Sequence, residues 1–398
     1  MTPSPRLRTL AICWSVVAAI GYAVDLWRQT QDHLTNGALR PFGDDFINYW
    51  SGAWLAWHQR AADIYNWDAF HAFEVSVAGA AIDFYHYSYP PVLLVLSAPL
   101  AFIPYVPALF AWLIAGWLAF YAALRAAWPQ RAAWLLALAT PAVFINAVGG
   151  QNGTWTAALL GGGLTLLERR PLVAGVLFGL LTYKPQIGIL LPLALLAGRQ
   201  WRAIAAAVVT AALLFVASVL LFGQEIWPAF LAHASVLRQL ILEDGTGVWH
   251  RMLSVFVAAR RLGAGVPAAY AVQAAFALAA AIVVVLAWWR DAPAPAKNAL
   301  LVLGTCLATP YLQDYDLVIG AFVVVWLAAP YAEGALPPAT QIAAALILLV
   351  PFVGAALARF TGLEFGPLFI APAFIVAAVA GFGTASRMSN ASAATASR

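Results

Sequence analysis

Residues 201–222 read WRAIAAAVVTAALLFVASVLLF, a stretch in which Arg202 is the only charged side chain. As an α-helix this stretch would extend about 33 Å, enough to cross the roughly 30 Å hydrocarbon core of a bilayer. Across the whole chain 63% of residues are hydrophobic and 10% are charged, against about 45–50% and about 25% in soluble domains. The mean hydropathy is +0.82. The sequence therefore predicts an all-α, polytopic integral membrane protein and excludes a soluble enzyme.

Twelve further apolar runs accompany this stretch. They cover 7–27, 91–104, 106–124, 132–148, 152–167, 171–184, 186–197, 268–289, 297–309, 315–329, 338–358 and 366–383. Arginines cluster at 168–170, 199–202 and 290–297, and the positive-inside rule places such clusters in the cytoplasm.

The same rule places both chain ends in the cytoplasm, because Arg6 and Arg8 flank Leu7 at the start of the first run and Arg387 follows the last. Both ends on one side require an even number of crossings. We expect twelve transmembrane helices in the cytoplasmic (inner) membrane, with either 91–104 or 132–148 not crossing.

Two polar segments, 28–90 and 223–267, interrupt the apolar runs and fall on the extracytoplasmic side by this count. Aromatic residues at three-and-four spacing predict short interfacial helices over 46–57 and 67–73 in the first segment. We expect residues 1–385 to form a single transmembrane catalytic domain, covered by the two outer loops 28–90 and 223–267. Residues 386–398, rich in Ser and Ala, are predicted to be a disordered tail.

Charge and cysteine content exclude other classes of partner. The net charge of +4 is small and scattered in short loops, which predicts no nucleic-acid partner. Cys13 and Cys306 are isolated within apolar runs, so neither a disulfide nor a zinc site is expected.

The unusual polar residues of the apolar region all lie at hairpins far from the arginine clusters. They occupy residues 149–152 (GGQN), 182–186 (TYKPQ) and 310–316 (PYLQDYD), and the loop 28–90 lies on the same face. The sequence therefore predicts one polar cavity that opens to the outside of the cell.

Lys184 lies near the end of an apolar run, where an unpaired ammonium costs a few kcal/mol and is usually kept for a partner or pathway. Pro185 would break the helix there and open its backbone, which favours binding of an anion such as a phosphate. The alternative is that Lys184 extends to the membrane interface.

Asp44 and Asp45 begin the first predicted interfacial helix. One of them would suffice as a helix cap complementing the helix dipole. A carboxylate at the mouth of an apolar cavity would instead suit a general base that takes a proton from an attacking hydroxyl. A metal site is the third alternative, but an isolated acid pair is weak support for one.

The aromatic stretch Phe84–Pro91 precedes the second apolar run. An interfacial aromatic belt explains much of it, while aromatic rings beside hydroxyls also suit sugar rings. His86 could carry a positive charge near a phosphate. Asp314 and Asp316 flank Tyr315, where helix capping and binding of sugar hydroxyls are both open.

In combination, these residues resemble glycosyltransferase family 87, of the GT-C superfamily. The resemblance runs through Asp45-Phe46 with Tyr49 and Trp50, Ile64-Tyr65, Tyr89-Pro90-Pro91, Gly150-Gln151-Asn152, Lys184-Pro185 and Asp314-Tyr315-Asp316. It implies a polyprenyl-phosphate-linked sugar donor and transfer to an acceptor on the outer face with inversion. It also implies that Asp45, with Asp44 as its neighbour, supplies the base, and that Lys184-Pro185 lies against the lipid phosphate.

An inverting displacement needs its base on the face of the sugar opposite the leaving phosphate, so an acid and a cation on facing walls fit this chemistry. We predict Lys184 with Arg251 or His250 at the phosphate, without a metal or other cofactor. The predicted substrate-binding side chains are Lys184, Tyr183, Gln151, Asn152, Tyr49, His86, Tyr89, His250, Arg251, Tyr311, Gln313, Asp314 and Asp316.

The predicted partners are the bilayer, the lipid-linked donor and a glycolipid or glycan acceptor. A transporter or flippase for a polar or lipid-linked solute is the alternative function, since intramembrane polar residues would serve it too. A transporter needs polar groups near the bilayer midplane with access from both sides. Their collection at one face favours the enzyme.

Overall fold

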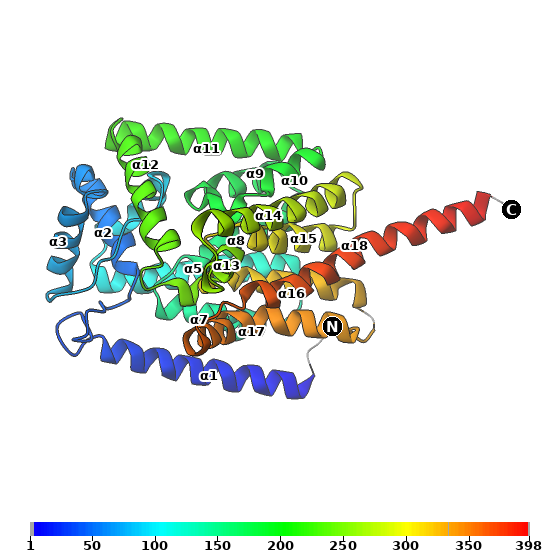
Figure 1. The fold of residues 1–398 in the computed structure, drawn as a ribbon, viewed down its shortest axis with the longest axis horizontal. Coiled ribbons are helices and arrows are strands. Elements are labelled where there is room, and N and C mark those ends of the chain that lie inside the picture. Colours follow the sequence, from blue (N-terminus) through cyan, green and yellow to red (C-terminus); the bar gives the residue numbers. More distant parts are fainter. Residues whose placement is uncertain (1–3, 333, 397–398) are drawn as a thin grey trace.

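The protein is all-helical. The computed structural model describes residues 4–332 and 334–396, and within them it has helices and isolated β-bridges but no β-strand. Most of the helices run along the longest axis of the molecule, as Figure 1 shows. The predicted all-α class is confirmed, and the apolar helices agree with a polytopic membrane protein.

Seven stretches of the described chain are long and apolar enough to cross a membrane. They are α1 (Pro5–Arg28), α5 (Tyr105–Ala127), α11 (Trp201–Phe222), α14 (Val266–Trp289), the continuous stretch of η7 (Asp314–Ile319), α16 (Gly320–Ala328) and η8 (Ala329–Tyr331), α17 (Pro338–Thr361), and the first part of α18 (Gly366–Ala396). Length and composition therefore support seven spans, fewer than the twelve predicted.

Shorter helices fill the remaining apolar runs. They are α4 (Val92–Leu96), η2 (Ala98–Phe102), α6 (Ala133–Ala139), α7 (Pro141–Val148), α8 (Gly153–Leu166), α9 (Pro171–Leu180), η3 (Leu181–Tyr183), η4 (Pro185–Gly188), α10 (Leu191–Ala197) and α15 (Ala294–Ala308). Proline explains two of the interruptions, because its ring cannot continue a preceding helix without a break. Pro141 separates α6 from α7, and Pro185 separates η3 from η4.

The bundle core forms around α8 and α15, which are buried along most of their length. The first packs against α5 and α9, and the second against α14 and α18. By contrast, α1 lies at the edge of the bundle, touches it mainly through α6 and α7, and has Ala18 as its only buried residue. This loosely attached helix runs along the lower margin of Figure 1.

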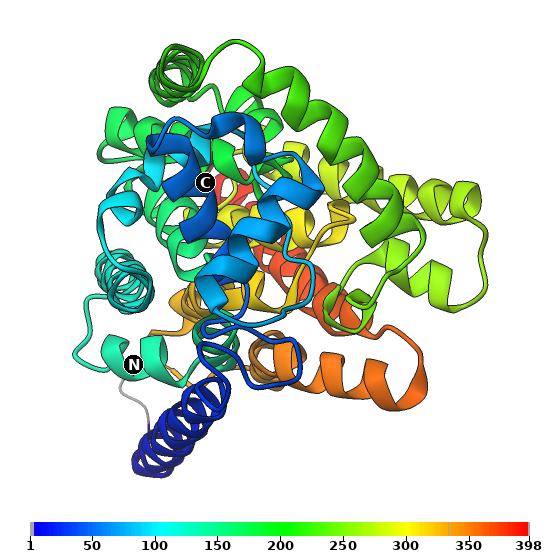
Figure 2. The ribbon, with the colours of Figure 1, turned by 90° about the vertical axis from the view of Figure 1, so that its left-hand side faces the viewer.

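The two polar segments fold into short helices. The first contains α2 (Phe46–Trp57), η1 (Ala61–Asp63) and α3 (Trp67–Ala78), and the second contains α12 (Ile226–Leu237), η5 (Arg238–Glu243), η6 (Trp249–Arg251) and α13 (Val255–Arg261). The helices predicted from Phe46 and from Trp67 are thus both present. Figure 2 looks onto the end of the bundle where α2, α3 and α12 lie in front of the long helices.

The C-terminal helix α18 is described as far as Ala396. The disordered tail predicted for residues 386–398 remains untested, and residues 397 and 398 lie outside the described residues.

Candidate active site

Three distant segments meet at the end of the bundle that carries α2. The turn Gly149–Gly153 is pressed between the start of α2 and the segment around Tyr315. Gly150 has a φ of +59°, and a Cβ there would lie 2.2 Å from the carbonyl oxygen of Gly43. A Cβ on Gly153 would lie 2.2 Å from the carbonyl oxygen of Tyr315. Only glycine permits such close backbone contact, so this turn fixes how the three segments are placed.

Asp45 occupies the N-cap position of α2, but its side chain makes no capping hydrogen bond. Its Oδ2 instead accepts a hydrogen bond from Nε2 of Gln151 and lies 4.0 Å from Nη1 of Arg251. The carboxylate therefore points across the site toward other segments and does not act as a helix cap.

The surroundings of Asp45 disfavour its charged form. Burial first, and then the neighbouring Asp44 carboxylate, raise the pKa of Asp45 from 3.8 to about 7, although Arg251 opposes them. About 30% of the Asp45 side chain remains accessible. A reachable carboxylate with a pKa near neutrality is suited to exchange a proton with a substrate hydroxyl.

Asp44 is held differently, although it is the adjacent residue. Its Oδ2 accepts a hydrogen bond of 3.1 Å from Nε of Arg40, and its Oδ1 accepts one of 2.7 Å from the Tyr85 hydroxyl. Arg40 also bonds Asp25 of α1 at 2.9 Å and the carbonyl oxygen of Val148 at 3.2 Å. Asp44 is therefore engaged in a network that ties α1, the first polar segment and α7 together.

Gln151 connects Asp45 to a row of tyrosines. Its Oε1 accepts a 2.8 Å hydrogen bond from the Tyr49 hydroxyl, which itself lies 2.7 Å from the Tyr89 hydroxyl. Because the Tyr49 proton goes to Gln151, Tyr89 must donate to Tyr49. Because its oxygen accepts from Tyr49 and its nitrogen donates to Asp45, the Gln151 amide is held in one orientation.

Lys184 lies at the break between η3 and η4 and is 2% exposed, so it does not extend to the surface. Its Nζ donates to Asp316 at 2.5 Å and to Asn152 at 2.9 Å, and it lies 4.4 Å from the ring centre of Tyr315. Lys184 and Asp316 are both buried and face one another as a salt bridge. Lys184 thus joins three segments, and its charge is balanced before any ligand binds.

Arg251 is a partly accessible cation beside Asp45. Its Nε and Nη2 donate to Asp314 at 3.0–3.3 Å, and its guanidinium lies 5.9 Å from the ring of Tyr315. The remaining nitrogen, Nη1, faces Asp45, and 24% of the side chain is accessible. Asp314 is therefore an anchor for Arg251, and Asp45 and Arg251 lie side by side with both side chains partly accessible.

A family model described as Glycosyltransferase family 87 matches residues 87–310, more than half of the chain. The chain belongs to glycosyltransferase family 87. Neither a curated protein nor a solved structure matches it. The match includes Gln151, Lys184 and Arg251, while Asp45 and Asp314 lie outside the matched residues. Family membership supports a membrane glycosyltransferase.

Tyr183 borders the site of this family 87 protein, with its ring centre 6.3 Å from that of Tyr89, whereas three other predicted site residues, His250, Tyr311 and His86, make contacts elsewhere. The hydroxyl of Tyr183 pairs with that of Thr156 at 2.8 Å. Nε2 of His250 lies 3.3 Å from Arg359. Tyr311 packs in the cluster around Met252 and Phe256, and His86 contacts Trp67, with ring centres 4.0 Å apart.

Gln313 contributes through its backbone, whose N–H donates to Oδ2 of Asp316 at 3.1 Å.

Burial, and then the nearby His233, lower the pKa of His86 to about 4. A neutral His86 would offer a phosphate a hydrogen bond and no positive charge. The other predicted residues form two contact groups. The first contains Tyr89, Tyr49, Gln151, Asp45, Arg251 and Asp314, with Asp44 beside Asp45. The second contains Asn152, Lys184 and Asp316, and the ring of Tyr315 lies near both Lys184 and Arg251.

Three residues that position the site were missed from the sequence. They are Arg40 and Tyr85, which hold Asp44, and Gln29, whose Oε1 accepts a 2.7 Å hydrogen bond from the Gly43 N–H. Arg40 precedes Asp44 by four residues, a spacing that often pairs opposite charges and that was available as a signal. Nothing local marks Gln29, because its partner lies in a separate turn.

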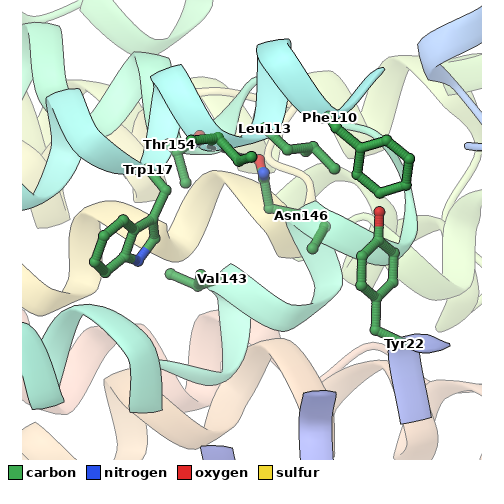
Figure 3. Close-up of a pocket in the computed structure, with 9 residues that line it drawn as sticks. Tyr22, Phe110, Leu113, Trp117, Val143, Asn146 and Thr154 are labelled. Atoms are coloured by element: carbon green, nitrogen blue, oxygen red, sulfur yellow. Dashed lines mark hydrogen bonds between the residues drawn. The ribbon is translucent and has the colours of Figure 1, made fainter. Parts of the chain in front are cut away.

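An apolar cavity of about 220 Å³ adjoins the site on the side of α1. Figure 3 shows Phe110, Leu113 and Trp117 of α5 on one side of it, with Tyr22 of α1 and Val143 of α7 on the other. Its wall is continuous with the site, since the carbonyl oxygen of Asn146, a lining residue, accepts a 2.8 Å hydrogen bond from the Gln151 N–H. The cavity could accommodate a hydrocarbon chain.

No group of three or more His, Cys, Asp and Glu side chains that could hold a metal ion exists among the described residues. The expectation that no metal or cofactor takes part in the reaction stays a prediction.

Proposed function

We propose that the protein transfers a sugar from a polyprenyl-phosphate donor to a glycolipid or glycan acceptor on the extracytoplasmic face of the membrane, with inversion at the anomeric carbon. The acceptor hydroxyl oxygen bonds to the anomeric carbon as the bond from that carbon to the phosphate oxygen breaks. The hydroxyl proton passes to Asp45, and the polyprenyl phosphate leaves with the bonding electron pair.

The observation that carries this proposal is the state of the Asp45 carboxylate. Gln151 fixes one of its oxygens, part of the side chain is reachable, and its pKa is raised to about 7. A general base works best when its pKa lies near the operating pH, because it is then both deprotonated and strong enough to accept a proton. A carboxylate of ordinary pKa would be a far weaker base.

The contacts also favour Asp45 over its neighbour. Asp44 has a guanidinium on one oxygen and a tyrosine hydroxyl on the other. Taking up a proton would weaken both bonds, so Asp44 is poorly placed to act as a base. We assign Asp44 the role of holding Arg40 and the start of α2 in place.

Arg251 is the better placed of the predicted phosphate ligands. Its Nη1 is turned toward Asp45, whereas Lys184 is buried and paired with Asp316. A guanidinium with one edge anchored on a carboxylate can present its other nitrogen to a phosphate oxygen without further ordering. We assign Arg251 to the leaving phosphate and Lys184 to the positioning of Asn152 and Asp316. Because inversion needs the base and the phosphate on opposite faces of the sugar, the donor sugar must enter between Arg251 and Asp45 and separate this 4.0 Å pair.

The apolar cavity beside α1 suits the prenyl chain of the donor. It lies between helices at the level of the apolar spans and borders the turn that holds Gln151. A lipid substrate bound there would keep its chain in hydrocarbon while its phosphate reached the polar site.

Twelve crossings remain our proposal for the topology. The five shorter units α6–α7, α8, α9–η3, η4–α10 and α15 would each cross, with the seven long stretches. Short spans are tolerated where the surrounding protein satisfies the backbone. The segment 91–104 would then be the one that does not cross, since α4 and η2 pack against α2. This places the termini in the cytoplasm and the site outside, in the inner membrane.

The proposal is tested with the full-length protein in lipid nanodiscs, supplied with labelled polyprenyl-phosphate sugars and a total membrane lipid extract as the source of acceptor. We expect label to move from the donor to a new lipid or glycan product. The alternative function, a transporter or flippase, is tested by measuring movement of the labelled donor across the membrane of proteoliposomes that contain the protein. Translocation of the intact donor across their membrane, with no transferred sugar, would favour the flippase.

A further inference from the structure

A second cavity, of about 330 Å³, lies between the start of α3 and α12. Tyr65, Asn66 and Trp67 form its wall on the side of the first polar segment, and His233 and Val236 form the wall on α12. It is open on one side and lies in the cover formed by the two polar segments. Its size is at the lower end of the range for small-molecule sites, about 300–1,000 Å³.

His233 is the unusual member of this cavity. It is 5% exposed, and neither of its ring nitrogens has a hydrogen-bond partner within the described part of the chain. Buried polar groups are nearly always satisfied by protein, water or ligand. His233 lines the cavity, and a turn of its ring would bring a buried nitrogen to a ligand placed there.

The rings around His233 form an aromatic wall. The centre of the Trp67 ring lies 5.1 Å from that of His233, and the centre of the Tyr65 ring lies 5.6 Å away. The His86 ring also contacts Trp67, with the two ring centres 4.0 Å apart. Aromatic faces beside hydrogen-bonding edges match a sugar ring, whose faces are apolar and whose edges carry hydroxyls.

The charge state of the cavity argues against an anion. No Lys or Arg is among the residues that line it. Burial lowers the pKa of His233 to about 4, so the imidazole is neutral at pH 7 and offers one donor and one acceptor. The Oδ1 of Asn66 accepts a 3.1 Å hydrogen bond from the Ala69 N–H, which leaves its amide nitrogen as a donor. These groups suit neutral hydroxyls better than a phosphate.

The cavity is connected to the candidate active site through tyrosines. The Tyr65 hydroxyl donates to the carbonyl oxygen of Tyr89 at 2.8 Å, and the Tyr89 hydroxyl continues through Tyr49 and Gln151 to Asp45. The apolar cavity beside α1 adjoins Asn146 and is lined by different residues. The position of this second cavity on the polar cover therefore fits the acceptor and not the donor lipid.

We propose that the cavity between Trp67 and His233 is a carbohydrate subsite, which binds a neutral sugar ring of the acceptor at a distance from the hydroxyl that reacts. The ring would stack on Trp67 and exchange hydrogen bonds with His233 and Asn66. The part of this assignment that makes the sugar a portion of the acceptor rests on the proposed function. It identifies the acceptor as a molecule that already carries a sugar, or an equivalent ring of hydroxyls.

The test measures saturation-transfer NMR on the full-length protein in nanodiscs, with methyl α-mannoside, methyl β-glucoside and methyl β-galactoside as probes. We expect at least one glycoside to receive saturation, strongest on one face of its ring. Trp67→Ala and His233→Phe should each weaken binding about five- to tenfold, as expected for the loss of one or two net hydrogen bonds or a stacking contact. His233→Phe keeps a ring in the packing, so loss of binding in a folded variant reports on the missing nitrogens.

Trp201→Ala is the matched control, because Trp201 is 62% exposed on α11 beside Arg202 and outside this cavity. Failure of all three glycosides to bind, or equal binding by His233→Phe and the unmodified protein, would overturn the proposal. Asp45→Asn should keep glycoside binding. Binding retained at this cavity in a protein that never transfers sugar would contradict the proposed function alone, and transfer without glycoside binding would contradict the subsite alone.

Discussion

Asp44 and Asp45 show how two adjacent carboxylates acquire different chemistry from their neighbours. Arg40 and Tyr85 hold the first, while the second has Gln151 as its hydrogen-bond donor and a guanidinium 4.0 Å away. Burial, together with the charge of the adjacent Asp44, leaves Asp45 able to take up a proton near pH 7.

The raised pKa of Asp45 predicts the pH dependence of the reaction. Protonation of Asp45 at low pH removes the base, so kcat/KM should fall about tenfold per pH unit well below an apparent pKa of about 7 and level off above it. A pH profile measured from pH 5 to 9 checks this. A profile that stays flat down to pH 5 would mean that no group with such a pKa accepts the proton.

The same shift has a consequence for stability. The folded-state pKa is raised from 3.8, so Asp45 favours the folded protein at low pH, and that contribution is lost as the pH rises through about 7. At pH 8 the Asp45→Asn variant should therefore be at least as stable as the unmodified protein.

Lys184 and Asp316 should behave as a buried pair. Lys184→Met alone leaves an uncompensated buried carboxylate and should cost about 3–5 kcal/mol of stability, whereas Lys184→Met with Asp316→Leu should cost much less. Thermal unfolding of both variants in nanodiscs measures the difference. Equal destabilisation by the single and the double variant would show that the two charges do not depend on each other.

At the residue scale, the sequence identified the polar side chains of the site but not the residues that they contact. Gln151, Lys184 and Asp314 stand out because amide and ionisable groups are rare in apolar runs. That Lys184 pairs with Asp316, and Arg251 with Asp314, could not be predicted, because the choice depends on distances between helices. His86 was predicted near a phosphate because it lies in an aromatic stretch that precedes an apolar run. The structure places it beside Trp67 and His233, and the sequence carried no sign of these two partners.

At the scale of elements, the turn before α8 determines the site. It lies between the backbone at Gly43 and that at Tyr315, and it carries Gln151 and Asn152 to their partners. The sequence predicted a hairpin at residues 149–152. Its close contact with the backbones at Gly43 and Tyr315 becomes evident only from the structure.

Gly150→Ala should impair the enzyme through this turn. The added Cβ would meet the Gly43 carbonyl at 2.2 Å, at a φ of +59° that disfavours any side chain, so Gln151 would move away from Asp45. We expect a loss of activity of about 10²-fold or more, comparable to a misplacement of about 1 Å in a catalytic group. Gly265→Ala is the control, because its backbone has no positive φ and only Pro267 lies within 4.0 Å. Equal activities of the two variants would remove the turn from the mechanism.

Element boundaries were predictable where an apolar period or a proline marked them. The helices starting at Phe46 and Trp67 follow from aromatic spacing, and the breaks at Pro141 and Pro185 follow from proline chemistry. The short helices over 91–104 were harder to place. Their sequence is as apolar as a span, and only their contact with α2 shows that they belong with the first polar segment.

At the scale of the whole molecule, one end of the bundle carries the polar network and the other carries the arginine clusters. This polarity requires a defined orientation in the membrane. Composition predicted that the protein is a polytopic membrane protein. Seven spans follow from helix length and hydropathy, and our proposal that the short helices also cross gives twelve. Hydropathy alone cannot separate a short crossing helix from a buried one, because both are apolar.

Cysteine accessibility tests this orientation. Asp68 of α3 and Gln130, between α5 and α6, are both exposed. In a protein with Cys13→Ala and Cys306→Ala, a membrane-impermeant maleimide added to intact cells should label Asp68→Cys and leave Gln130→Cys unlabelled. Labelling of Gln130→Cys from outside, with Asp68→Cys protected, would reverse the proposed topology.

The central claim is that Asp45 removes the proton from the acceptor hydroxyl, and the turnover of Asp45→Asn tests it most directly. The amide is nearly isosteric but cannot accept the proton, so we predict that kcat for sugar transfer falls about 10³-fold, within the range for general-base catalysis. Asp68→Asn, a change at an exposed acid on α3, should keep full activity. Undiminished turnover by Asp45→Asn, in a variant that unfolds at the same temperature as the unmodified protein, would contradict the account.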